Sequence, residues 1–244
     1  MEGPFPIGAG SGGRARAVRV TSFEELDEAA RALDLSGLTA LVVVGGAGGM
    51  SPPELRRLRP MFSEVIAPLA EQRRMSVIDG GTDTGVMRLM GRARAEGGHS
   101  FPLVGVIVDE LAAHGSSPSE TDAADPEPNH THFVLVPGTH WGEEAPWLSR
   151  LASVSAGTAP SATVLVNGGE VAWDDVRLSV EAGRPVVVVE DSGRTADAVA
   201  AAAHGRGADL RANSLVDSGL VHVVNADDRA GLARLLDGLL AEGS

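Results

Sequence analysis

The chain alternates short runs of β-branched and aliphatic residues with longer segments of helical period, and this alternation restricts the fold more than any other feature. The runs expected to form strands cover residues 18–20, 40–44, 75–78, 103–108, 133–136, 162–166, 185–189 and 221–224. The segments expected to form helices cover residues 23–33, 53–72, 86–96, 145–154, 174–182, 195–204 and 230–240. Because strands that alternate with helices form βαβ units, we expect an α/β fold with a doubly wound, mostly parallel sheet flanked by helices.

Two segments interrupt this alternation. Residues 1–17 are rich in Gly and Pro, and we expect them to form a disordered N-terminal tail. Residues 109–132 form a long link without apolar period, which is typical of a lid, a binding loop or a disordered segment. The strand pattern resumes directly after this link, so we expect residues 18–244 to form one domain.

The composition limits both the core and the partners. Hydrophobic residues make up 43% of the chain and aromatic residues only 3%, so the core must be built from Val, Leu, Ala and Ile, as in buried parallel strands. The 33 acidic residues outnumber the 20 basic ones, and the net charge of −13 would repel nucleic acid or an anionic membrane unless one face were locally basic.

The chain has no cysteine, which excludes disulfides, zinc–thiolate sites and thiol nucleophiles. It has neither an apolar run long enough to cross a bilayer nor the apolar core of a signal peptide, so we expect a cytoplasmic protein.

Five of the expected strands end in turns rich in Gly or small polar residues. These turns cover residues 45–49, 79–85, 137–142, 167–170 and 190–194, and four of them lead directly into a helix. In an open α/β sheet the ligand crevice lies at the carboxyl ends of the strands. Glycine lets the backbone approach a ligand closely, and the N-terminus of the following helix attracts anions. Any one turn is equally consistent with an ordinary connection, but five together favour a cradle for phosphate.

The turn 79–85 carries the clearest chemistry. Thr82 and Thr84 are placed to cap the helix expected from residue 86, or to bond a phosphate group. The turn is not a Walker A loop, because no Lys follows it, and it lacks the spacing of the dinucleotide-binding fingerprint.

Three segments in order resemble a known family. They are residues 78–87 (IDGGTDTGVM), 129–136 (NHTHFVLV) and 187–197 (VVVEDSGRTAD). These segments are similar to the N-terminal cytosolic region of melastatin-type TRP channels, which belongs to the SLOG superfamily together with the LOG and DprA proteins. The resemblance runs with gaps from about residue 40 to about residue 204, and is to the stand-alone prokaryotic branch often called LSDAT.

The resemblance implies a Rossmann-like fold that binds nucleotides or their derivatives, and in some of the channels this region binds ADP-ribose. By position it implies contacts from residues 45–48, 80–87, 141 and 192–194. Together with the turns, it gives the following expected ligand-binding residues: Gly45, Gly46, Ala47, Gly48, Gly80, Gly81, Thr82, Thr84, Gly85, Val86, Met87, Gly138, Thr139, His140, Trp141, Asn167, Gly168, Gly169, Glu170, Glu190, Ser192, Gly193 and Arg194.

Two of these residues have alternative interpretations. Arg194 beside a Gly turn suits bidentate recognition of phosphate, but it is also consistent with an exposed residue at a helix start that pairs with Asp197. Trp141 takes the place of an aromatic in the channel motif and is expected either to stack on adenine or to anchor its loop.

The resemblance also raises the question of catalysis. LOG proteins carry a Pro-Gly-Gly-x-Gly-Thr-x-x-Glu motif and cleave nucleoside 5′-monophosphates to a free base and ribose 5-phosphate. The corresponding residues 167–175 read NGGEVAWDD, so Val171, Ala172 and Asp175 replace the second Gly, the Thr and the Glu of that motif. We therefore expect a cytosolic ligand sensor rather than an enzyme. The alternatives are a nucleotide or ADP-ribose hydrolase, with Asp175 and Glu144 as candidate catalytic residues, and a ligand-free scaffold.

The histidines are the remaining candidates for chemistry. His130 and His132 are expected to share one face of a strand, with His140 just beyond it. With a carboxylate such as Glu143 or Glu144 they could bind a metal, but packing and hydrogen bonding are favoured, and we expect neither a metal nor a cofactor other than the nucleotide-derived ligand. The apolar helices expected after residues 196 and 230 could support a homodimer.

Overall fold

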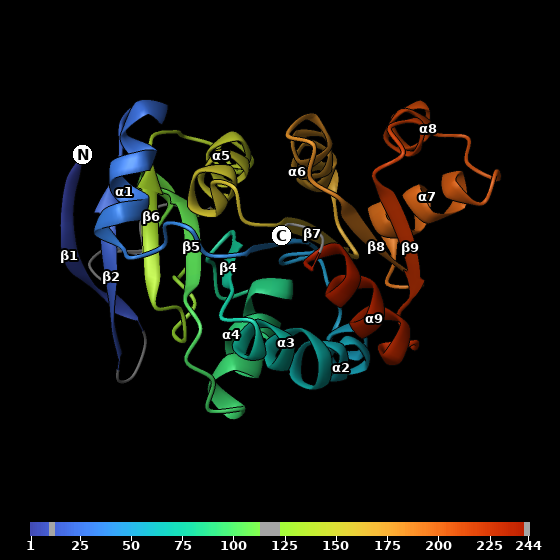
Figure 1. Ribbon diagram of the computed structural model, residues 1–244, viewed down its shortest axis with the longest axis horizontal. Helices are drawn as coiled ribbons and strands as arrows, with labels where there is room; N and C mark the ends of the chain where they lie inside the picture. The colour runs from blue at the N-terminus through green and yellow to red at the C-terminus, as the bar shows by residue number, and fades with distance from the viewer. Residues whose placement is uncertain (10–12, 113–122, 242–244) are drawn as a thin grey trace.

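A single sheet runs through the middle of the protein, between two layers of helices (Figure 1). The computed structural model describes residues 1–9, 13–112 and 123–241. The described residues form nine strands in the order β1-β2-β6-β5-β4-β3-β7-β8-β9. Their bounds are β1 (Glu2–Ala9), β2 (Gly13–Arg19), β3 (Ala40–Gly45), β4 (Ser76–Asp79), β5 (Leu103–Val108), β6 (His132–Val136), β7 (Ser161–Val166), β8 (Val186–Glu190) and β9 (Val221–Asn225).

The central strands have the order of a Rossmann fold. The strands β5-β4-β3-β7-β8-β9 are neighbours in the sheet and are all parallel. If these six are numbered by their order along the chain, leaving out β6, their order across the sheet is 3-2-1-4-5-6. The winding starts at β3, goes outward through β4 and β5, and after β6 returns across the sheet to β7. The predicted α/β class, with a doubly wound and mostly parallel sheet, is therefore confirmed.

Helices cover both faces of the sheet (Figure 1). One layer contains η1 (Phe23–Glu25), α1 (Leu26–Ala32), α5 (Ala145–Ala156), α6 (Glu170–Glu181), α7 (Arg194–Ala203) and α8 (Leu210–Asp217). The other contains α2 (Pro52–Met61), the π-helical turn η2 (Phe62–Ile66), α3 (Ala67–Gln72), α4 (Gly85–Glu96) and α9 (Arg229–Leu239). A short 3₁₀ turn, η3 (Asp109–Leu111), follows β5.

Strand β8, in which four valines precede Glu190, explains why both layers are needed. Val186 and Val188 pack into the core beneath α5 and α6, whereas Val187 and Val189 pack into the core beneath α2 and α9. All four are fully buried, because side chains alternate between the two faces of a strand. A continuous apolar run of this kind is typical of a parallel strand covered on both sides.

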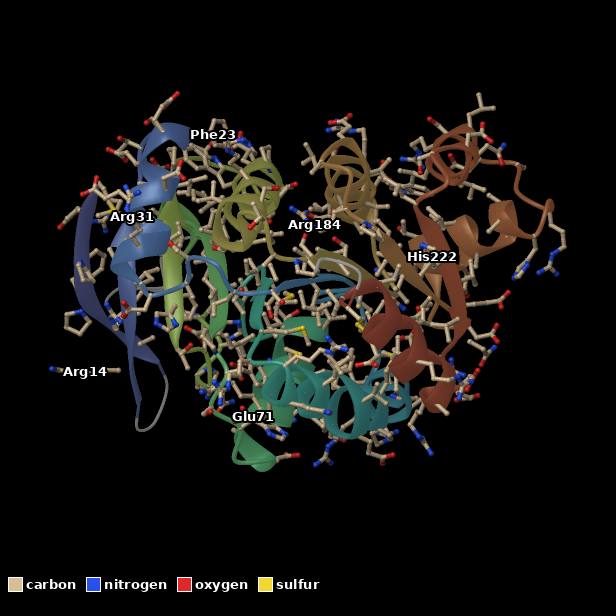
Figure 2. The ribbon with its side chains drawn as sticks, in the orientation of Figure 1. Arg14, Phe23, Arg31, Glu71, Arg184 and His222 are labelled. Atoms are coloured by element: carbon tan, nitrogen blue, oxygen red, sulfur yellow. The ribbon has the colours of Figure 1, made fainter. Side chains whose placement is uncertain are left out.

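The packing between α5 and α6 includes a buried cation. Arg184, labelled in Figure 2, is 2% exposed and donates to the Ser149 carbonyl at 2.9 Å and to Ser153 Oγ at 2.8 Å. Burial lowers the pKa of its guanidinium to about 10. The contact ties the amino end of β8 to α5, at the edge of the sheet away from the Gly-rich turns.

The expectation of a disordered tail at residues 1–17 is wrong for the described part of that segment. Residues 13–19 form β2, which pairs in parallel with β6, and residues 2–9 pair with β2 in antiparallel fashion. The reason is an alternation that the Gly and Pro content obscured. Ala15 and Ala17 are buried, whereas Arg14 and Arg16 are exposed, as in a strand with one face on the core.

Two further segments differ from the expectations. Helix α8, at residues 210–217, was not predicted, because it is short and Leu210 at its start is 82% exposed instead of facing the core. The long link expected at residues 109–132 is partly structured, since η3 begins it and residue 132 already belongs to β6. Residues 113–122 of this link lie outside the described residues.

Candidate functional site

A cavity of about 350 Å³ lies at the carboxyl ends of β3 and β4, beside the point between β3 and β7 where the winding of the sheet reverses. The turns after these strands form one wall, and the segment 141–148 together with the start of α6 forms the other. The residues predicted from sequence that line this cavity are Gly45, Ala47, Gly48, Gly80, Thr82, Thr84, Met87, Trp141, Glu144 and Asp175. The structure thus brings together residues that are more than a hundred positions apart in the chain.

Three other predicted residues shape the cavity from behind its wall. The Val86 N–H donates to the Gly46 carbonyl at 2.9 Å, which joins the turn after β4 to the turn after β3. Gly85 has a φ of +49°, and a Cβ added there would lie 1.9 Å from the Gly46 carbonyl oxygen. A side chain at this position would therefore push the two turns apart.

The N-terminus of α4 presents an unsatisfied polar group to the cavity. Thr84 is the N-cap residue of α4, but its hydroxyl makes no capping hydrogen bond. Its Oγ1 is buried and finds no hydrogen-bond partner anywhere in the described residues. Thr82, which is 5% exposed, lines the same wall. Because the first N–H groups of a helix and its dipole attract anions, this corner of the cavity suits an oxyanion.

Glu144 and Asp175 bring two carboxyl groups to the opposite wall. Glu144 is the N-cap residue of α5, and its Oε2 accepts the Gly142 N–H at 2.8 Å. Burial, and then the charges of Glu144 and Asp174, raise the pKa of the Asp175 carboxyl to about 8. Burial also raises the pKa of Glu144, although hydrogen bonds from backbone N–H groups oppose this effect. The pair therefore retains a proton near neutral pH.

A buried cluster, which we call the latch, consists of Asp79, Glu127 and His130. His130 Nε2 lies 2.8 Å from Asp79 Oδ1, and His130 Nδ1 lies 2.9 Å from Glu127 Oε2. All three side chains are buried. Burial lowers the pKa of His130, but the charges and hydrogen bonds of the two carboxylates outweigh this effect and raise it to about 9. The imidazolium is thus held between two carboxylates.

The latch fixes residues 123–131 against the turn after β4. The Glu127 N–H donates to the Gly81 carbonyl at 2.8 Å, and Thr82 forms an isolated bridge with Pro126. This contact places Ala124 at the cavity. The expectation that His130 and His132 share a strand face is wrong, because β6 begins at His132 and His130 precedes it. No sequence signal pointed to Glu127.

The turn 137–142 folds around Glu143 instead of opening toward the cavity. Glu143 Oε2 accepts the N–H groups of Thr139 at 2.6 Å and His140 at 3.1 Å. A Cβ added to Gly138 would lie 2.6 Å from the same oxygen. The His140 side chain is 81% exposed, so Trp141 is the predicted residue of this turn that lines the cavity.

The turns after β7 and β8 are bonded to each other beside the cavity. The Asn167 N–H donates to Ser192 Oγ at 2.7 Å, and Asn167 Nδ2 donates to the Ser192 carbonyl at 2.6 Å. A Cβ on Gly193 would approach Asn167 Nδ2 to 2.6 Å, and one on Gly168 would approach Thr195 Cβ to 2.7 Å. These residues position the start of α6 and do not line the cavity.

Arg194 joins two of the Gly-rich turns. Its guanidinium donates to the Gly49 carbonyl at 3.0 Å and to the Gly168 carbonyl at 3.4 Å. It lies at the rim, outside the lining of the cavity. The alternative of an ion pair with Asp197 does not occur, since Asp197 Oδ1 has no hydrogen-bond partner among the described residues.

Two predicted carboxylates, and the glycine beside one of them, lie away from the cavity. Glu170 forms an ion pair with Arg211 at 2.5 Å, and Glu190 Oε1 lies 3.1 Å from His204 Nε2. Gly169 is the N-cap residue of α6 and does not line the cavity.

Apart from Ala47, Met87 and Trp141, the apolar residues of the lining were not predicted. Leu148 and Val171 contribute to it from α5 and α6. A sequence signal existed, because Leu148 follows Glu144 by four residues and Val171 precedes Asp175 by four, and residues at this spacing share a helix face.

No helix within residues 1–9, 13–112 and 123–241 is long and apolar enough to span a bilayer.

Comparisons with known sequences give a consistent family. Residues 38–233 match the family model described as SLOG in TRPM, prokaryote. Transient receptor potential cation channel subfamily M member 2 of Mus musculus and that of Rattus norvegicus are each 28% identical to this chain over 204 residues. These alignments cover 69% of this chain and 13% of each channel, so the chain corresponds to a small part of the channels' length.

Comparisons with solved structures show the same fold. The X-ray structure of TM1055 superposes with a TM-score of 0.55 at 20% identity, covering 82% of this chain and 99% of that one. The molybdenum cofactor carrier protein of Chlamydomonas reinhardtii gives 0.53 at 20% identity, with 84% and 99% covered. The molybdenum cofactor binding protein of Rippkaea orientalis gives 0.53 at 13% identity, with 82% and 96% covered.

Proposed function

Because this chain belongs to the prokaryotic SLOG-in-TRPM family, we propose that it is a ligand-binding protein whose cavity holds a nucleotide-derived small molecule of the ADP-ribose class. One observation carries the proposal: the N-terminus of α4 borders this cavity. Its N-cap residue, Thr84, has a buried Oγ1 without a hydrogen-bond partner among the described residues. A phosphate oxygen would accept a hydrogen bond from this hydroxyl, and the positive end of the helix dipole would stabilise its charge, although the Val86 N–H is already bonded to the Gly46 carbonyl.

The glycine-lined wall supports a phosphate at this corner. Gly45, Gly48 and Gly80 expose backbone instead of side chains, so an anion can approach N–H groups closely. A Cβ on Gly48 would lie 3.9 Å from Thr84 Oγ1, which shows that the space between the two turns is open.

The apolar wall supports a base. Trp141, Leu148, Val171 and Met87 line the cavity together. A planar heterocycle would bury its faces against such side chains, and the polar groups at the cavity ends would fix its orientation. Arg194, at the rim, adds positive potential near the entering phosphates, while its present bonds hold the turns in place.

Ligand binding is tested by thermal unfolding with ADP-ribose, AMP, NAD and cyclic nucleotides. A ligand present at 100 times its dissociation constant is expected to add about 2.7 kcal/mol to the free energy of unfolding. Thr84→Val should weaken the bound ligand by roughly 1.5–3 kcal/mol, because the lost hydrogen bond would be to a charged group. Thr158→Val, an exposed threonine at the other edge of the sheet, is the matched control. No stabilisation by any nucleotide at millimolar concentration would refute the proposal.

A second candidate function is hydrolysis of the same class of ligand. The observation that favours it is the pair of carboxyl groups, Glu144 and Asp175, in one cavity, because a raised pKa suits a general acid. Incubation with AMP or ADP-ribose followed by chromatography separates the candidates. A sensor leaves the ligand intact, whereas a hydrolase releases free base or a ribose phosphate.

A further inference from the structure

We propose that the part of the cavity between Glu144 and Asp175 accepts a cationic group, so that the bound nucleotide derivative carries a positively charged ring or amine. This inference rests on the proposed function, that the cavity binds a nucleotide derivative. It adds which chemical group of the ligand lies against the wall formed by the segment 141–148 and α6.

The first argument is the composition of the lining. Glu144 reaches the cavity from the start of α5, and Asp175 reaches it from α6. No Arg or His is among the described residues that line this cavity. Arg194 lies outside it, bonded to the Gly49 and Gly168 carbonyls. The cavity therefore has two carboxyl groups on one wall and no basic side chain among its described lining residues.

The second argument is that the carboxyl groups are under-bonded. Glu144 Oε2 accepts one hydrogen bond, from the Gly142 N–H at 2.8 Å. The carboxyl group of Asp175 has neither a hydrogen bond nor an ion pair with any described residue, although the backbone carbonyl of Asp175 accepts the Ser179 hydroxyl at 2.9 Å. Its neighbour in sequence, Asp174, by contrast pairs with Arg177 at 3.0 Å. Both side chains are half-buried, so a carboxyl group without a partner is poorly solvated there, and a cationic ligand group would supply that partner.

The third argument is electrostatic. The charged groups that act on Asp175 are Glu144, at the start of α5, and Asp174, on the same helix as Asp175, and both are acidic. Glu143 acts on Glu144 in the same direction. With the pKa of Asp175 raised to about 8, its carboxyl group holds a proton at neutral pH. An entering cation makes the ionised form favourable, so binding releases this proton to the buffer.

The wall beside the pair suits a flat cation. Trp141 and Leu148 line the cavity together with the two carboxyl groups. A ring that carries positive charge is attracted to the face of an indole and to carboxylates at once. A pyridinium nucleotide combines such a ring with the phosphates expected at α4, and NAD⁺ is therefore the probe of choice.

Calorimetric titrations with NAD⁺, NADH and ADP-ribose test the proposal on the full chain at pH 7, in two buffers of different ionisation enthalpy. NAD⁺ and NADH differ in the charge of the ring, whereas ADP-ribose lacks the ring. We expect NAD⁺ to bind about tenfold more tightly than NADH, a ratio that corresponds to ~1.4 kcal/mol. We also expect NAD⁺ binding to release up to one proton, and ADP-ribose binding to release none.

The outcomes distinguish the two proposals. If none of the three compounds binds, the proposed function fails. If all three bind, with NAD⁺ and NADH equal and without proton release, the proposed function stands and the cationic subsite is overturned.

A matched pair of variants locates the effect. Asp175→Asn keeps the shape of the side chain and removes its charge, and should abolish both the preference for NAD⁺ over NADH and the proton release, while ADP-ribose affinity stays within about twofold. Asp174→Asn changes the adjacent residue, which does not line the cavity, and should leave the preference intact. Retention of the preference in Asp175→Asn, with thermal unfolding confirming a folded protein, would overturn the assignment.

Discussion

Replacing His130 with Gln is expected to change how the stability of the protein depends on alkaline pH. In the folded state the pKa of His130 is raised from 6.5 to about 9, because two carboxylates hold the imidazolium in the latch. The extra stability is fully present below pH 6.5 and is lost as pH rises through 9. At ~1.4 kcal/mol for each pH unit, the difference between 6.5 and 9 corresponds to about 3 kcal/mol of unfolding free energy.

The composition makes this measurement unusually clear. The chain contains no Cys, Lys or Tyr, which are the side chains that ordinarily titrate between pH 8 and 11. Urea unfolding at pH 6, 7.5, 9 and 10 should show the wild type losing about 3 kcal/mol relative to His130→Gln across this range. His140→Gln, which removes a histidine that is 81% exposed, is the control and should follow the wild type. If the unfolding free energy of His130→Gln depends on pH in the same way as that of the wild type, the argument that a buried imidazolium stabilises the latch is refuted.

Three further changes have defined outcomes. Gly48→Val adds atoms to the open space beside Thr84 Oγ1 and should weaken ADP-ribose binding by about 1–3 kcal/mol, measured by calorimetry, whereas Gly238→Ala, where a Cβ would meet no described atom within 4 Å, should not. Arg194→Ala should weaken phosphate-bearing ligands by on the order of tenfold, with a smaller loss in high salt, and equal loss at all salt concentrations would argue for a purely structural role. Ser51→Ala removes the capping box at the start of α2 and should lower the urea-derived unfolding free energy by about 1 kcal/mol, and no change would show that the cap does not contribute.

The sequence predicts the parallel strands and the turns at their carboxyl ends, because both follow from the pattern of apolar residues. The valines of β8 and the aliphatic run of β3 define buried parallel strands, and parallel strands require helices on both faces. The Gly-rich turns after β3 and β4 follow from the same pattern, because all carboxyl ends of parallel strands meet at one edge. This geometry is why Thr84 and Trp141, predicted separately, line one cavity.

The remainder depends on contacts between distant residues. The latch joins Asp79 to Glu127 and His130 across about fifty positions, and no local pattern indicates that a histidine will be buried between two acids. Hairpin β1–β2 was overlooked because small alanines alternate with arginines, which gives a weak apolar period. Arg194 was expected to contact the ligand, but it donates to backbone carbonyls instead. Every residue has a carbonyl, so the amino-acid types in the sequence do not indicate which carbonyls an arginine will reach.

The glycines at the two edges of the sheet should differ in mutational tolerance. At the amino edge, where helices α6 and α8 end, Gly183 and Gly219 have φ values of 70° and 74°, and a Cβ would meet no described atom within 4 Å. At the carboxyl edge, a Cβ on Gly45 or Gly85 would lie 1.8 or 1.9 Å from a carbonyl oxygen. Asn, which tolerates positive φ, can replace glycine at the first edge, whereas the second edge accepts no side chain at these positions. Substitutions are therefore expected to be tolerated at these glycines of the amino rim, whereas close backbone contacts exclude them at the rim that borders the cavity.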